Sequence, residues 1–187
     1  MLINNWKRVF ISMRYFLTLI FFGDRYDVVF VCSSTFNRGK SHENYLFKPM
    51  IEFCKKNNIS YVIFEEAYLR SFKSYEINKE AIPLDFISIL KIILRKILNF
   101  ISSKPTSSDE IYFQELKIAK ILKNIFFNKF HSKVYITLIW NNVTLWRSIN
   151  PCAPVVDYQH GFIFDGEEEY INNGHVAKVK TDNDVTT

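Results

Sequence analysis

The sequence predicts a single α/β domain with a Rossmann-like parallel sheet and flanking helices. Short apolar runs alternate with longer segments of helical spacing, and only five glycines and five prolines interrupt the 187 residues. Hydrophobic residues make up 48% of the chain and charged residues 23%, as in an ordinary folded protein. Because this length suits one hydrophobic core, we expect residues 1–187 to form one domain.

The strands are predicted from four apolar or β-branched runs, at residues 27–32, 61–64, 133–140 and 154–158. Helical spacing over residues 42–57 separates the first two runs, and a shorter helical segment over residues 143–149 separates the last two. Parallel neighbours need such crossovers, so the order predicts βαβ units.

Further helices are predicted outside these units. Residues 1–22 contain an amphipathic helix, which either lies on a membrane surface or packs on its own domain. Residues 84–102 and 109–128 form two more helices with a turn between them. This helical insertion over residues 84–128 either covers the sheet or presents a binding surface.

The net charge of +5 comes from basic residues that are spread along the chain, which does not favour nucleic acid as a partner. A diffuse positive field does favour phosphate-bearing substrates or an anionic membrane surface. Lys7, Arg8 and Arg14 interrupt the apolar N-terminal segment, so no membrane-spanning helix is expected there. We expect a cytoplasmic protein, with association with the inner face of the membrane as an alternative.

The cysteines and histidines give no metal-ligand pattern. Cys32, Cys54 and Cys152 are far apart and include no CxxC pair, which predicts neither a disulfide framework nor a zinc site. The four histidines share no ligand spacing with acidic residues or cysteines. We therefore expect no metal and no cofactor.

The sharpest candidate for chemistry follows the fourth predicted strand, where open α/β sheets present their ligands. His160 can accept a proton near neutral pH, and Asp157 is a candidate to orient its ring, although a regular strand would point the two residues to opposite faces. Glu168, in an acidic stretch, could bind or deprotonate an acceptor hydroxyl. Gln159 and Gly161 are candidate substrate contacts. The alternatives are a hydrogen-bonded structural histidine and a solvated acidic loop.

A second group of candidate substrate-binding residues follows the first and third predicted strands. Hydroxyls, amides and cations at the mouth of a sheet suit a phosphate or a sugar. The residues are Ser33, Ser34, Arg38 and Lys40 after the first strand, and Asn141 and Asn142 after the third. The first loop lacks both the P-loop and the dinucleotide-binding glycine patterns. Asn141 and Asn142 could instead cap the helix that follows them.

Residues 155–163, with their Gln-His-Gly motif, resemble capsular polysaccharide and lipopolysaccharide glycosyltransferases of the GT-B type. In that family an apolar strand leads into Gln-His-Gly near the end of the N-terminal domain. Residues 138–142 and 170–175 are also similar to the family, and the resemblance covers about residues 26–187. Asp157 departs from the glutamate that related sequences often carry.

The resemblance implies an N-terminal, acceptor-side domain of a GT-B fold, with His160 in the cleft as base or as a contact to donor phosphate. It implies a glycan acceptor and a nucleotide-sugar donor, the donor being held by a second domain that is absent from these 187 residues. We expect a truncated chain that does not transfer sugar alone. The alternatives are a teichoic-acid-type phosphotransferase and a non-catalytic membrane-surface or partner-binding module.

Overall fold

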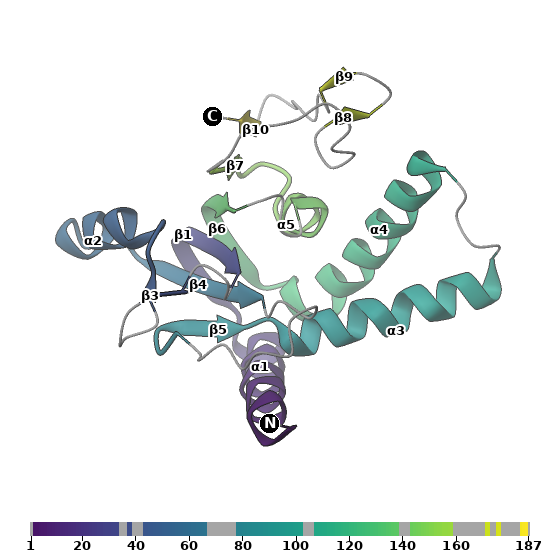
Figure 1. Cartoon of the computed structure of the whole chain (residues 1–187), viewed down its shortest axis with the longest axis horizontal. Helices are drawn as coiled ribbons and strands as arrows, with labels where there is room; N and C mark the ends of the chain where they lie inside the picture. Colours follow the sequence, from purple (N-terminus) through teal and green to yellow (C-terminus); the bar gives the residue numbers. More distant parts are fainter. Residues whose placement is uncertain are drawn as a thin grey trace.

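A six-stranded parallel sheet with flanking helices forms the domain, which confirms the predicted α/β Rossmann-like fold (Figure 1). The computed structural model describes residues 2–33, 37–38, 43–66, 78–102, 107–138, 143–158, 171–172, 175–176 and 184–186. The strands of the sheet are β1 (Asp24–Ser33), β4 (Tyr61–Glu66), β5 (Ala81–Pro83), β6 (Phe130–Thr137), β7 (Val155–Asp157) and β10 (Asp184–Thr186). Two short antiparallel pairs lie outside it, β2 (Asn37–Arg38) with β3 (Glu43–Asn44) and β8 (Ile171–Asn172) with β9 (His175–Val176).

The strand order is β10-β7-β6-β1-β4-β5. From β1 the chain builds outward through β4 to β5, then returns to the other side of β1 and builds outward through β6 and β7 to β10. This is the doubly wound order, and its direction reverses between β1 and β6. The carboxyl ends of the strands therefore meet along one edge, with this reversal near its centre.

The two faces of the sheet carry different layers. On one face, Phe47, Ile51 and Cys54 of α2 (Lys48–Lys56) and the turn before it pack on Phe30 and Cys32 of β1. The opposite face is covered by α1 (Leu2–Phe22), α3 (Asp85–Ile101), α4 (Ser108–Leu122), the π-helical turn η2 (Lys123–Phe127) and α5 (Val143–Ile149). Because both faces are covered, the central strands are continuous apolar runs.

Stacked aromatic rings fill the core on the face covered by α1. Phe64 of β4 lies between Phe16 of α1 and Trp146 of α5, with ring centroids 5.9 and 5.4 Å away. Tyr135 of β6 also stacks on Trp146, with ring centroids 5.5 Å apart. All four rings are fully buried, so this stack joins α1, the sheet and α5 into one core.

The N-terminal helix α1 packs on its own domain through one side. Phe16 and Leu19 enter the core, and the Ser12 hydroxyl accepts a hydrogen bond from the backbone N–H of Phe86 at 3.1 Å. The helix ends at Phe22, and the next residue, Gly23, has a φ of +70°, which suits a glycine after a helix; the chain then turns directly into β1. Its opposite side faces away from the sheet.

The predicted helical insertion is a hairpin of α3 and α4 that runs out from the sheet and back (Figure 1). Ser107 caps α4 by accepting a hydrogen bond from the backbone N–H of Glu110, and the Glu110 carboxylate accepts one from the backbone N–H of Ser107. Part of the hairpin covers the sheet, because Ile87 and Ile118 are buried in the core. Its distal part keeps large apolar side chains such as Phe100 exposed.

Candidate functional site

The carboxyl edge of the sheet between β1 and β6 is the candidate ligand site. Open α/β sheets bind ligands at this edge, where the strand order reverses and the loops on its two sides diverge. Ser33 ends β1, and Leu138 follows β6 with its backbone N–H donating to the Val31 carbonyl at 3.1 Å. The predicted sugar- and phosphate-binding residues thus follow two adjacent strands in the sequence.

Several predicted site residues lie outside the described residues. These are His160, Glu168, Ser34, Lys40, Asn141, Asn142, Gln159 and Gly161. Arg38 is described only through its backbone, in β2. Of the predicted set, the side chains of Ser33 and Asp157 are described, and they end β1 and β7, which are separated in the sheet by β6.

Asp157 is buried at the carboxyl end of β7. It pairs in register with Thr137 of β6, and the Thr137 hydroxyl donates to Asp157 Oδ1 at 3.0 Å. This bond satisfies one carboxylate oxygen and fixes the side chain against the neighbouring strand. The predicted contact of Asp157 with the His160 ring stays a prediction.

Glu66 is a further candidate site residue, which the sequence patterns did not single out. It ends β4, lies in register with Ser33 and is half-buried. Desolvation raises the pKa of its carboxyl to about 7, with Lys91 lowering that pKa and Asp85 raising it. A carboxyl group with a pKa near neutrality can give or take a proton under physiological conditions, which suits a general acid or base. The signal in the sequence was the acidic pair Glu65-Glu66, which directly follows the strand predicted at residues 61–64.

A buried ion triad supports the same edge from beneath. Arg8 of α1 donates to Glu65 Oε1 at 2.7 Å and to Asp85 Oδ2 at 3.0 Å. Arg8 and Glu65 are buried, and the two residues lie 57 positions apart in the sequence. Burial lowers the pKa of the Arg8 guanidinium, but hydrogen bonds and charge from Asp85 and Glu65 more than offset this and raise it. The triad joins α1, the end of β4 and the start of α3.

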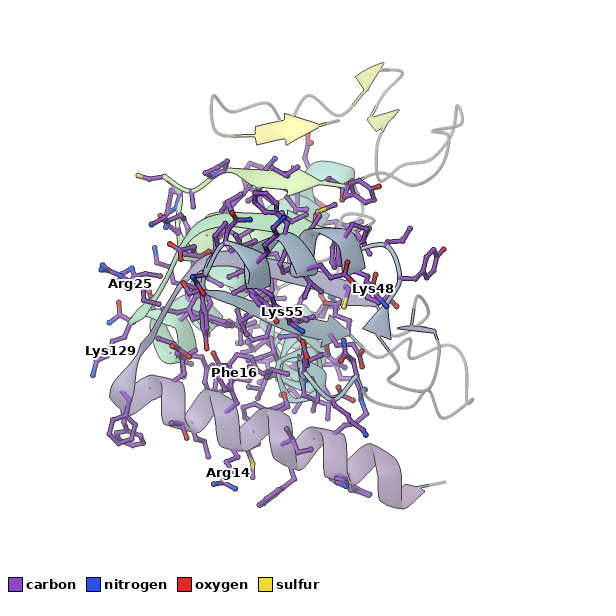
Figure 2. All side chains as sticks on the ribbon, turned by 90° about the vertical axis from the view of Figure 1, so that its left-hand side faces the viewer. Arg14, Phe16, Arg25, Lys48, Lys55 and Lys129 are labelled. Carbon is purple, nitrogen blue, oxygen red and sulfur yellow. The ribbon has the colours of Figure 1, made fainter. Side chains whose placement is uncertain are left out.

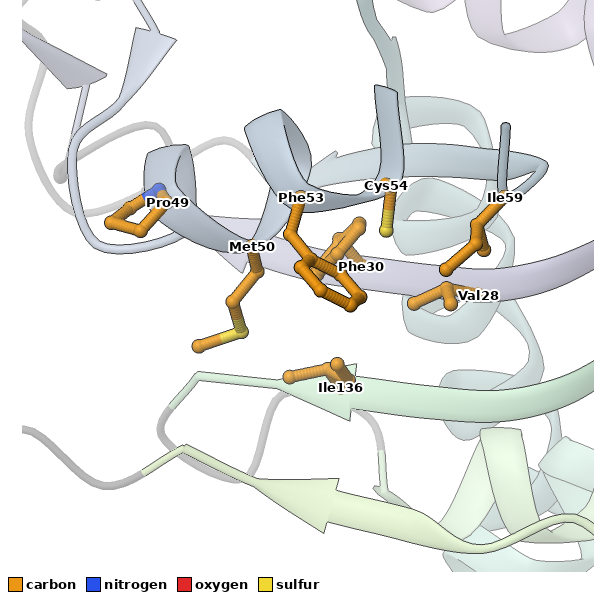
Figure 3. Close-up of a pocket in the computed structure, with 8 residues that line it drawn as sticks. All are labelled: Val28, Phe30, Pro49, Met50, Phe53, Cys54, Ile59 and Ile136. Atoms are coloured by element: carbon orange, nitrogen blue, oxygen red, sulfur yellow. The ribbon is translucent and has the colours of Figure 1, made fainter. Parts of the chain in front are cut away.

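An apolar hollow lies on the other side of the sheet, beside α2 (Figure 3). It has a volume of about 390 Å³ and is lined by Val28, Phe30, Pro49, Met50, Phe53, Cys54, Ile59 and Ile136. Sugars and phosphates need hydrogen-bonding partners, and these side chains offer none beyond a thiol. The hollow is therefore distinct in chemistry from the carboxyl edge.

Two features are absent from the described residues, a metal-binding group and a membrane-spanning helix. No group of three or more His, Cys, Asp or Glu side chains among them is arranged to hold a metal ion. None of the helices in the described ranges combines the length and the apolarity required to cross a bilayer.

Comparisons with known proteins found no match: no family model fits the sequence, and no curated protein or solved structure is significantly similar to the chain.

Proposed function

We propose that this chain is the acceptor-side domain of a glycosyltransferase that builds a bacterial surface polysaccharide or lipopolysaccharide. In this proposal the glycan acceptor binds at the carboxyl edge between β1 and β6, and the nucleotide-sugar is held by a donor domain. The observation that carries it is the reversal of strand order between β1 and β6, because residues with polar side chains follow both strands in the sequence.

The geometry at Glu66 supports a role in proton transfer. Its register with Ser33 brings it to the edge next to β1, and its raised pKa keeps part of the carboxyl protonated near pH 7. A sugar hydroxyl becomes a better nucleophile when a base removes its proton. We assign this task to His160 or Glu66, and substrate contacts to Ser33, Ser34, Arg38, Lys40, Asn141, Asn142, Gln159 and Gly161.

The polarity of the described part of this edge also fits a carbohydrate. Ser33, Thr137 and Asp157 end three strands of the sheet with hydroxyl and carboxylate groups. Sugars are recognised by hydrogen-bonding groups on a rigid frame, and of these three residues only Ser33 is partly exposed, because Thr137 and Asp157 are buried and bonded to each other. The buried Thr137–Asp157 bond and the Arg8 triad supply that rigidity beneath the edge.

The experiment measures binding of the purified chain to an array of bacterial surface oligosaccharides, followed by titration of the best ligand. Glu66→Gln and His160→Ala are the test variants, because each removes a titratable group from the proposed site. We expect each to weaken binding tenfold or more, the usual effect of losing one hydrogen bond to a charged group.

Two substitutions serve as matched controls. Glu52→Gln changes an exposed glutamate of α2, and His131→Ala changes an exposed histidine at the opposite end of β6. Both should leave the dissociation constant within a factor of two. Absence of glycan binding, or equal binding by all four variants, would overturn the proposal.

A further inference from the structure

The outer side of α1 carries a row of large apolar side chains that the core does not use. Trp6, Phe10 and Phe21 are 67%, 60% and 70% exposed, and Leu17 lies between them on the same side of the helix. The opposite side holds Phe16, which points into the sheet in Figure 2 while Arg14 points away from it. We call Trp6, Phe10, Leu17 and Phe21 the outer stripe.

Basic side chains border the outer stripe. Lys7 and Arg14 are exposed on the same side of α1, and the helix contains no aspartate or glutamate. Arg25 and Lys129 are exposed at its C-terminal end, where the Lys129 ammonium donates to the Phe21 carbonyl at 3.0 Å. The surface is therefore apolar along its length and positive at its flank and end.

We propose that α1 binds the domain to an anionic lipid bilayer by lying in the plane of the membrane surface. The outer stripe enters the boundary between headgroups and acyl chains, and Lys7 and Arg14 contact lipid phosphates. The inference concerns a surface separate from the carboxyl edge, so it holds or fails independently of the proposed function.

The charge on α1 favours anionic lipid over a second copy of the chain as the partner. Pairing of two α1 helices through their outer stripes would bring Lys7 and Arg14 near the same cations of the other copy, with no carboxylate on either helix to offset them. Like charges placed opposite each other oppose such an interface. Lipid phosphates instead neutralise these cations and leave the aromatic side chains at the depth that Trp and Phe favour.

The direction of α1 sets how the domain would stand on the bilayer. The helix runs antiparallel to β1, because its C-terminus leads directly into the start of β1 while Arg8 reaches Glu65 at the end of β4. Trp6, Lys7 and Phe10 thus lie toward the carboxyl edge of the sheet. On a membrane this edge would open close to the lipid headgroups.

The test is flotation of the full chain with phosphatidylcholine vesicles that contain 0 or about 30% phosphatidylglycerol. We expect binding to the anionic vesicles only. Trp6→Ser with Phe10→Ser should lower the partition coefficient at least tenfold. Lys7→Gln with Arg14→Gln should lower it about 25-fold, because each cation near an anionic surface contributes about fivefold.

The matched control is Ile93→Ser with Phe100→Ser, which removes two exposed apolar side chains from α3 instead. This variant should bind as the unmodified chain does, and circular dichroism should give the same spectrum for all variants. The proposal would be overturned if the α1 variants bound vesicles as well as the unmodified chain, or if the α3 variant lost as much binding as the α1 variants. It would also be overturned if the chain bound neutral vesicles as well as anionic ones. So would dimers in size-exclusion chromatography that the Trp6→Ser and Phe10→Ser changes dissociate.

Discussion

Arg8 and Glu65 form an ion pair, 2.7 Å between Nη1 and Oε1, at a place where both side chains are buried. Asp85 completes the pairing by accepting from the guanidinium Nε at 3.1 Å. A buried charge is tolerated only when it is paired and hydrogen-bonded, so each member depends on the others.

Arg8→Met should lower the free energy of unfolding by about 3–5 kcal/mol, because it leaves the Glu65 carboxylate buried without its partner. Urea titration followed by circular dichroism measures this change. Arg14→Met, on the exposed side of the same helix, should shift stability by less than about 0.5 kcal/mol. Equal effects of the two substitutions would contradict the buried pairing.

Stability should fall as pH rises from about 4.5 to about 7 through the titration of Glu66. The native state holds the proton more tightly than the unfolded chain, since desolvation raises the folded pKa to about 7 while the unfolded value is about 4.3. The protonated form is therefore the stable one, and ionisation costs about 3–4 kcal/mol at pH 8. Urea midpoints of Glu66→Gln between pH 4.5 and 8 should lack this part of the slope. Glu52→Gln should retain it, and an unchanged slope in Glu66→Gln would refute the assignment.

The three thiols should differ in reactivity. Cys152 is exposed, whereas Cys32 and Cys54 are buried, and burial raises the pKa of both buried thiols. Because the thiolate is the reactive species, iodoacetamide should modify Cys152 first in the native protein. Peptide mass spectrometry after short exposures measures the order, and Cys152→Ser should remove the fast phase. Rapid modification of Cys32 in native protein would be inconsistent with its place in β1.

Gly23→Ala should destabilise the protein by more than about 1 kcal/mol. The residue has φ +70°, and a Cβ there would lie 2.8 Å from the Lys129 carbonyl oxygen. Asn58 also has a positive φ, of 53°, so Asn58→Gly meets no such strain and should change stability by less than about 1 kcal/mol. Thermal melting of the two variants compares them directly, and a Tm for Gly23→Ala equal to that of the unmodified chain would contradict the turn geometry.

The central strands could be predicted from sequence because burial on both faces leaves a continuous apolar run. Residues 27–32 and 61–64 fall inside β1 and β4, and the βαβ order followed from the helix between them. The third strand was placed slightly late: β6 begins at Phe130 and ends at Thr137, whereas the prediction was 133–140. Its early residues alternate exposed and buried, and that half-exposed pattern was not recognised as strand.

The edge strands were missed for a different reason. β5 has only three residues and includes Pro83, so it is too short to show a strand pattern, and β10 lies in a polar segment. Their strand conformation follows from pairing with β4 and β7, which is a tertiary property.

The roles of the charged residues also depend on tertiary contacts that a local sequence pattern does not reveal. Arg8 was grouped with Lys7 and Arg14 as a cation interrupting an apolar helix, yet it alone of the three enters the interior. Its partners lie 57 and 77 residues away, so no local pattern could identify it. The shifted pKa of Glu66 likewise depends on desolvation by the folded chain.

The N-terminal helix α1 contributes side chains to the core on one side and is exposed on the other. A protease or truncation that removed residues up to Phe22 would strip Phe16 from its stack with Phe64 and leave Glu65 without Arg8. We therefore expect the rest of the chain to unfold when this segment is removed. The Arg8 guanidinium also links the helix to the end of β4 and the start of α3.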